Sequence, residues 1–237
     1  MKRVYREAVT RRVEGGWGIA LDGRPMCTPA RHELVVPSAA LAEAIAVEWS
    51  AQQDDIRPAT MPLTRLAATA IDRTRVQREQ VIADTANYAG TDLVCYRAER
   101  PPELIARQQA EWQPLLDWAM LRYDASLAVT SGILPQPQSP AALKAFAAVV
   151  AAQDDFRLTA LHTMTAACGS LVIALALLEG RLEAAAAFAV SQLDETFQIE
   201  AWGEDAEAAA RRQALAEDIG AAARFVQLLD AAQDRTD

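Results

Sequence analysis

Apolar and polar residues follow two different periods along the chain, and the change between them predicts its architecture. Residues 4–36 contain short apolar runs separated by Gly15-Gly16 and Asp22-Gly23, which are typical turn signals of antiparallel hairpins. Further along, apolar residues recur every three or four positions, as they do on the buried face of an α-helix. The pattern therefore predicts an α+β protein, with a small N-terminal β-containing domain followed by a larger, mainly α-helical domain.

The first helix is predicted to begin after Ser38, a good N-cap residue. Leu41, Ile45 and Trp49 follow at a spacing of four and are expected to form its buried, structural stripe, while Glu43, Glu48 and Gln52 face away. A proline-bounded loop at residues 54–62 comes next, and we place the domain boundary there. The two predicted domains are residues 1–62, β-rich with one helix, and residues 63–237, helical.

The rest of the chain is predicted to be helical, apart from a strand at residues 92–98 that could pair with a weaker one at 127–130. Pro114 lies inside one expected helix and should kink it or split it at Gln113. The helices are expected at residues 63–73, 75–88, 101–123, 141–152, 155–178, 181–202 and 204–229.

The net charge of the chain argues against two classes of binding partner, nucleic acids and anionic membranes. The chain carries 23 lysines and arginines against 32 aspartates and glutamates, a net charge of −9. Nucleic acid and anionic membrane surfaces both require a basic face, so neither is expected as a main partner. The most apolar run, residues 171–178, is too short to cross a bilayer, and we expect no membrane insertion. Arg65, Arg73, Arg75 and Arg78 are interpreted as surface charge balanced by Asp72 and Glu79.

Motifs for enzymatic chemistry are missing. The sequence has no P-loop, no GxGxxG, no HExxH and no GxSxG, which argues against common nucleotide, metal and hydrolase chemistries. Its three cysteines are far apart and there are two histidines, so a zinc site is not expected. We predict no cofactor and no metal. The cysteine pattern fits reduced thiols in a cytosol-like compartment.

The stretch from Phe188 to Gly203 is the candidate functional segment. Asp194, Gln198 and Trp202 are spaced by four and line one stripe of the predicted helix, and Gly203 is expected to end it. The neighbouring Glu195 points about 100° away from Asp194, so the two do not form a carboxylate dyad by themselves. From the residues alone, a solvated helix face and a binding surface both remain open.

Several short segments, taken in order, resemble one family of proteins. The chain is similar, from about Tyr5 to Phe225, to the F1-ATPase assembly chaperones that bind the alpha subunit, found in mitochondria and alphaproteobacteria. The segments that carry the resemblance are Leu21–Ala30, Val35-Val36-Pro37-Ser38, Leu41-Ala42, Glu48-Trp49 with Gln52, Met61-Pro62-Leu63-Thr64, Ala70-Ile71-Asp72, Thr91-Asp92-Leu93, Gln109–Trp112, Gly169-Ser170-Leu171, Leu193-Asp194-Glu195, Phe197-Gln198 and Trp202-Gly203.

The resemblance implies a non-enzymatic chaperone. Such a protein binds the free alpha subunit of F1 and covers the surface that alpha would otherwise present to a beta subunit, until beta replaces it. We expect a monomer, in the bacterial cytoplasm or, if the protein is eukaryotic, in the mitochondrial matrix. Two alternatives stay open: a small-molecule enzyme with an acidic helical cleft, and a stable scaffold subunit of a complex.

The resemblance also assigns site residues. The functionally sensitive carboxylate of the family falls on Asp194 or Glu195, and a sensitive tryptophan falls on Trp49, where a folding role is expected. In the enzyme alternative, Asp194 or Glu195 would act as a general base. The predicted partner-binding residues are Asp194, Glu195, Gln198 and Trp202, and the predicted structural residues are Trp49, Leu41, Ile45 and Gly203.

Overall fold

The computed structural model describes residues 2–132 and 136–231. Contacts within it define two compact units, each assembled from more than one stretch of the chain. The predicted domain boundary after residue 62 stays a prediction, because contact clustering does not show which part folds independently. The N-terminal unit contains the described residues of Met1–Arg78, Asp155–Ala160 and Arg224–Asp237, and the helical unit contains Glu79–Asp154 and Leu161–Ala223.

The N-terminal unit contains a four-stranded sheet centred on β2 (Gly16–Leu21). β1 (Ala8–Val13) pairs with it in an antiparallel hairpin, as the Gly15-Gly16 turn signal predicted. β3 (Arg24–Pro25) and β4 (Val35–Val36) pair antiparallel with opposite ends of β2. A Cβ added at Gly16 would lie 2.4 Å from the Val36 carbonyl oxygen, so this close strand approach requires glycine.

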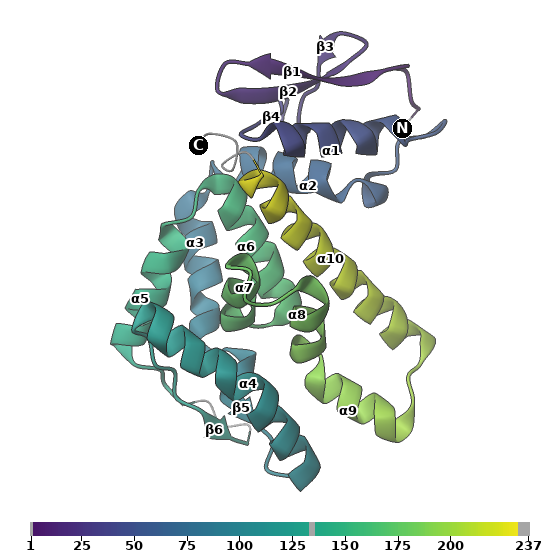
Figure 1. Ribbon diagram of the computed structural model, residues 1–237. Helices are drawn as coiled ribbons and strands as arrows, with labels where there is room; N and C mark the ends of the chain where they lie inside the picture. The colour runs from purple at the N-terminus through teal and green to yellow at the C-terminus, as the bar shows by residue number, and fades with distance from the viewer. Residues whose placement is uncertain (1, 133–135, 232–237) are drawn as a thin grey trace. The chain divides into compact units, whose positions relative to one another are not determined.

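Helix α1 (Ala39–Ser50) lies along one face of this sheet and packs against β1 and β2 (Figure 1). The Leu41 amide donates to the Ser38 hydroxyl at 3.2 Å, which confirms the predicted N-cap. Leu41 and Ile45 are completely buried, whereas Trp49 keeps part of its surface exposed.

Two polar residues of this region do not face away as expected. The Glu48 carboxylate accepts hydrogen bonds of 2.8 Å from the backbone amides of Leu63 and Thr64, and so caps the first turn of α2 (Pro62–Thr69). Gln52 is buried, and its side chain bonds Arg57 and Thr60 in the loop before α2. The partners of Glu48 and Gln52 lie outside α1, so the periodicity of that helix gives no information about them. The prediction that both side chains face away was therefore wrong.

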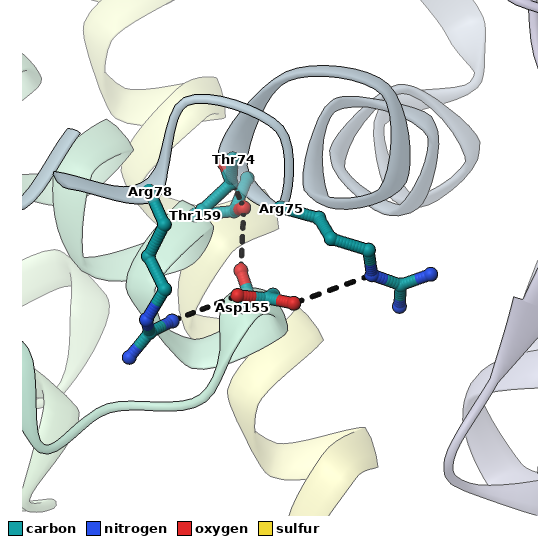
Figure 2. A network of polar contacts seen from close by, with 5 residues as sticks. All are labelled: Thr74, Arg75, Arg78, Asp155 and Thr159. Atoms are coloured by element: carbon teal, nitrogen blue, oxygen red, sulfur yellow. Dashed lines mark hydrogen bonds and ion pairs between the residues drawn. The ribbon is translucent and has the colours of Figure 1, made fainter. Parts of the chain in front are cut away.

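After α2 the chain passes through a π-helical turn, η2 (Ala70–Thr74), before α3 (Arg78–Ala86). Asp155, at the start of α6 (Asp155–Cys168), holds this turn in place (Figure 2). Its carboxylate pairs with Arg78 at 2.7 Å and with Arg75 at 3.3 Å. The hydroxyls of Thr74 and Thr159 lie 2.7 Å apart beside this pair of contacts.

The helical unit is built around α4 and α7, which contact each other and the elements beside them. The α+β class is confirmed. No helix among residues 2–132 and 136–231 is long and apolar enough to cross a membrane. The remaining elements are η1 (Pro58–Thr60), η3 (Asn87–Gly90), η4 (Leu93–Cys95), β5 (Tyr96–Arg97), α4 (Pro102–Tyr123), β6 (Thr130–Ser131), α5 (Pro140–Ala151), α7 (Leu171–Leu178), α8 (Ala184–Ser191), α9 (Leu193–Trp202) and α10 (Ala206–Asp230).

Several predicted boundaries were wrong. The strand expected at 92–98 shrinks to β5, which does pair with β6, in parallel. The helix expected at 155–178 is broken at Gly169, whose φ of 65° ends α6. Pro114 does not split α4, because Ala110, whose carbonyl loses its amide partner, lies on the exposed side where water can replace it.

Asp92 anchors the start of α7 from the interior of the helical unit. This fully buried carboxylate accepts hydrogen bonds from the amide of Val172 at 3.1 Å and from the amide of Val94 at 3.2 Å. Burial raises the pKa of Asp92 to about 6, although these hydrogen bonds oppose the shift. One carboxylate therefore caps two helical turns that are far apart in the sequence.

Candidate functional site

Helix α9 carries the four residues predicted to bind a partner. The helix expected at 181–202 is divided at Gln192, so α9 begins anew and changes direction from α8 (Figure 1). Trp202 is 81% exposed, Gln198 is also exposed, and Glu195 is partly exposed. Gly203, with φ of 82°, ends the helix after Trp202.

Asp194 differs from the other three because it points into the helical unit. Its side chain accepts a 2.8 Å hydrogen bond from the Gln108 amide of α4. Burial raises the pKa of Asp194, while the Gln108 bond and the nearby charge of Arg97 act in the opposite direction. The structure therefore gives Asp194 an intramolecular partner.

Glu195 makes weaker contacts with the rest of the protein than Asp194 does. Its only ion pair among the described residues is with Arg211 of α10, at 3.7 Å and on the surface. A contact of this length in water contributes little stability, so the carboxylate is available to another cation. The structure thus separates the two carboxylates that the sequence could not tell apart: Asp194 is held within the unit, and Glu195 faces outward.

Arg97 lies behind Asp194 and was missed by the sequence analysis. It is 8% exposed, donates to the Gln108 carbonyl at 2.6 Å, and lies over the Trp112 ring at 5.2 Å. Its Nε and Nη2 atoms are buried without a hydrogen-bond partner in the described part of the chain. The one available signal was an arginine directly after the apolar run 93–96, where a buried charge must be compensated.

The N-terminal unit contains a second candidate site, a pocket of about 710 Å³. Its wall is mainly apolar, and one side of it is formed by α2 and η2. We call it the Trp49 pocket. The lining includes Met26, Leu34, Trp49, Ile56, Met61 and Ala68, together with Cys27, Arg65, Asp72 and Arg73.

Trp49 itself has two different sides. Its ring centroid lies 5.6 Å from that of Tyr5, whose hydroxyl donates to the Trp49 carbonyl at 2.7 Å. The indole Nε1 is buried and has no hydrogen-bond partner among the described residues. A buried indole N–H normally finds an acceptor. The structural role expected for Trp49 stays a prediction, and the pocket adds a second possible role.

Asp72 holds the loop that forms another wall of the pocket. Its carboxylate accepts from the Thr28 hydroxyl at 2.6 Å and the Ala30 amide at 3.0 Å, and lies 2.9 Å from Nδ1 of His32. Burial alone would raise the pKa of Asp72, but these three contacts together lower it. Asp72 therefore does not balance the arginine cluster as expected.

Neither site resembles a metal centre. Within residues 2–132 and 136–231 there is no group of three or more histidine, cysteine, aspartate or glutamate side chains placed to hold a metal ion. The thiols of Cys95 and Cys168 are buried, and burial raises the pKa of each to about 12. Cys27 is exposed in the pocket wall.

Comparison with known proteins settles the family. Residues 2–120, half of the chain, match the family described as "ATP12 chaperone protein". The crystal structure of Atp12 from Paracoccus denitrificans superimposes with a TM-score of 0.93 at 42% sequence identity, covering 96% of this chain and 98% of that one. The chain belongs to the ATP12 chaperone family.

Two further relatives agree with this assignment. A lysine-for-aspartate mutant of P. denitrificans Atp12p gives the same TM-score and sequence identity. The match covers 96% of this chain and 97% of the mutant's chain. Mitochondrial protein atp12 of Schizosaccharomyces pombe is 25% identical over 214 residues, which is 85% of this chain and 74% of the relative. The expected relation to F1 assembly chaperones is confirmed. The residues that match the ATP12 model include the Trp49 pocket and end before α9.

Proposed function

We propose that this ATP12-family protein binds the free alpha subunit of F1 and shields its subunit interface until beta replaces it. Membership of the family is the observation that carries the proposal. A free subunit interface is large and apolar, and it aggregates when exposed. A chaperone that binds only the unassembled form protects it by mass action, and gives way to beta because beta buries more surface.

On this protein, we propose the outer side of α9 as a contact surface. We call Glu195, Gln198 and Trp202 the α9 surface. An exposed tryptophan supplies a large apolar contact, and a carboxylate beside it can form a charge-assisted hydrogen bond with an arginine or lysine of the client. Asp194 belongs to the support beneath this surface, through its bond to Gln108.

The role is non-catalytic in this proposal, and the protein acts as a monomer. The general-base alternative is not favoured by the contacts of Asp194, which are an amide donor and a nearby guanidinium rather than a second acid or base. A bacterial cytoplasm or the mitochondrial matrix is the proposed compartment, because F1 subunits fold and assemble there.

Size-exclusion chromatography of purified components tests the proposal. The protein should co-elute with free F1 alpha in a one-to-one complex without added ATP, and adding beta should release it. Retention in the finished alpha–beta assembly would indicate a scaffold subunit instead. Failure to co-elute with alpha under any refolding condition would contradict the proposal.

A further inference from the structure

We propose that the Trp49 pocket is a second client-binding site, which takes an apolar peptide segment of the partner carrying a carboxylate. The inference rests on the proposed function for the identity of the client, but it concerns a different surface from α9. It follows from three features of the pocket: an apolar wall, two unpaired cations at its edge, and a frame that is already fixed.

The wall provides the apolar part of the site. The side chains that line it form a cavity of about 710 Å³, within the range of known ligand pockets. Met26 and Met61 contribute to it, and methionine adapts to apolar side chains of different shapes.

The arginines define the charge of the ligand. Of the four in this region, Arg75 and Arg78 pair with Asp155, as Figure 2 shows. Arg65 and Arg73 line the pocket, are exposed, and have no ion-pair partner within the part of the chain that the structure describes.

One acidic residue, Asp72, also lines the pocket, and its single negative charge offsets only one of these two positive charges. Asp72 is occupied by its contacts to Thr28, Ala30 and His32. The edge of the pocket is therefore locally basic, although the whole chain carries a net charge of −9. A carboxylate is the complementary group, and arginine binds it through two parallel hydrogen bonds.

The elements around the pocket are held in place by side-chain hydrogen bonds and ion pairs. Glu48 caps α2, which carries Arg65, and Gln52 fixes the loop containing Pro58. The Arg75–Asp155 ion pair and the Thr74–Thr159 hydrogen bond fix the turn that follows Arg73. A site ordered before binding avoids the entropic cost of forming it, which favours binding.

Cys27 provides a direct reporter for occupancy. It lies exposed in the pocket wall, whereas Cys95 and Cys168 are buried. Cys27 also lines a neighbouring cavity beside Tyr5 and Leu21, so the rate at which the folded protein reacts with the thiol reagent DTNB measures access to the pocket and to this adjoining surface. We expect saturating F1 alpha to slow this reaction about tenfold or more, as a well-packed contact excludes solvent and reagent.

Charge reversal tests the recognised group. Arg65→Glu and Arg73→Glu should each weaken alpha binding about tenfold, the effect of losing one charge-assisted hydrogen bond. Arg224→Glu is the matched control, because Arg224 is an exposed arginine of the same unit outside the pocket. It should bind alpha normally. Thermal unfolding of all three variants shows that they are folded.

The outcomes separate this inference from the proposed function. A complex with alpha in which Cys27 reacts as fast as in the free protein would overturn the pocket proposal and leave the chaperone function intact. Binding by Arg65→Glu and Arg73→Glu equal to that of Arg224→Glu would overturn the carboxylate recognition. If wild-type protein forms no complex with alpha, both proposals fail together.

Discussion

The side chain of Gln108 donates a hydrogen bond of 2.8 Å to Asp194, and so ties α9 to α4. The other end of the same amide accepts from the backbone of Ala98, and the Gln108 carbonyl accepts from the buried Arg97. Gln108 therefore connects α9, which carries the exposed residues proposed to bind the client, to the buried charge of Arg97. The two acidic residues at the start of α9 should consequently respond differently to substitution.

Reversing the charge of Asp194 should destabilise the helical unit. In Asp194→Lys, an ammonium group would replace the acceptor of Gln108 and lie near the charge of Arg97. We expect a loss of about 1–2 kcal/mol in the free energy of unfolding, discounted for the partial exposure of the site. Urea denaturation measures it. Asp194→Asn keeps an acceptor and should lose less, and equal stability of the lysine and wild-type proteins would contradict this role.

Glu195 should behave in the opposite way. Glu195→Lys removes a long surface ion pair and should change the free energy of unfolding by less than about 0.5 kcal/mol. It should nevertheless lower alpha binding, as should Trp202→Ala, because both belong to the α9 surface. Glu111→Lys, an exposed acid of the same unit on α4, is the matched control in the binding titration. Unchanged affinity of both α9 variants would contradict the proposal that the α9 surface contacts alpha.

The buried Asp92 gives a stability contribution that falls as pH rises. Its pKa in the folded state is about 6, above the value of 3.8 expected when it is exposed. The native state therefore binds more protons between these values, and this contribution is complete below about pH 4 and lost as pH rises through 6. The change amounts to as much as ~3 kcal/mol.

Comparison with an amide variant isolates the titration of Asp92. Urea unfolding of wild type and Asp92→Asn at pH 4.5 and pH 7.5 should show the wild type gaining relative stability at the lower pH. Asp92→Ala should be the least stable protein at both, because it loses the acceptor for the amides of Val94 and Val172. A difference between wild type and Asp92→Asn that does not change with pH would contradict the raised pKa.

Asp72 should show the reverse pH dependence. Its pKa is lowered in the folded state, so its contribution is present above about pH 4 and is lost as pH falls through the folded value. Asp72→Ala should cost about 2 kcal/mol at neutral pH, because it leaves the hydroxyl of Thr28 and the amide of Ala30 without their acceptor. Faster DTNB reaction of Cys27 in the free variant would report the loosened loop, and an unchanged rate would argue against this anchoring role.

The sequence pattern correctly predicted those parts of the fold that depend on residues close together in the sequence. The β1–β2 hairpin, the Ser38 cap and the α+β class all follow from periodicity and turn chemistry. The break at Gln192 does not, because the chain there contains no glycine or proline and the helix direction is set by packing. The break at Gly169 is different, because glycine often ends a helix and the signal was present in the sequence.

The polar contacts that organise the candidate sites join residues far apart in the sequence. Glu48 meets the start of α2, Asp72 meets the loop at residues 28–32, and Gln108 meets Asp194. Each of these side chains looks like an ordinary surface residue when only its own helix is considered. The resemblance pointed to Asp194 or Glu195 and to Trp49, but only the structure shows that Asp194 bonds Gln108 and that Trp49 lines a pocket.

The proposed chaperone function can be measured in an aggregation assay on purified F1 alpha, diluted from denaturant with and without this protein. Beta subunit and an unrelated acidic helical protein serve as controls for client and chaperone. We expect suppression that is specific to alpha, reached near equal stoichiometry, and independent of added ATP. Absence of suppression, or equal suppression of alpha and beta, would contradict it.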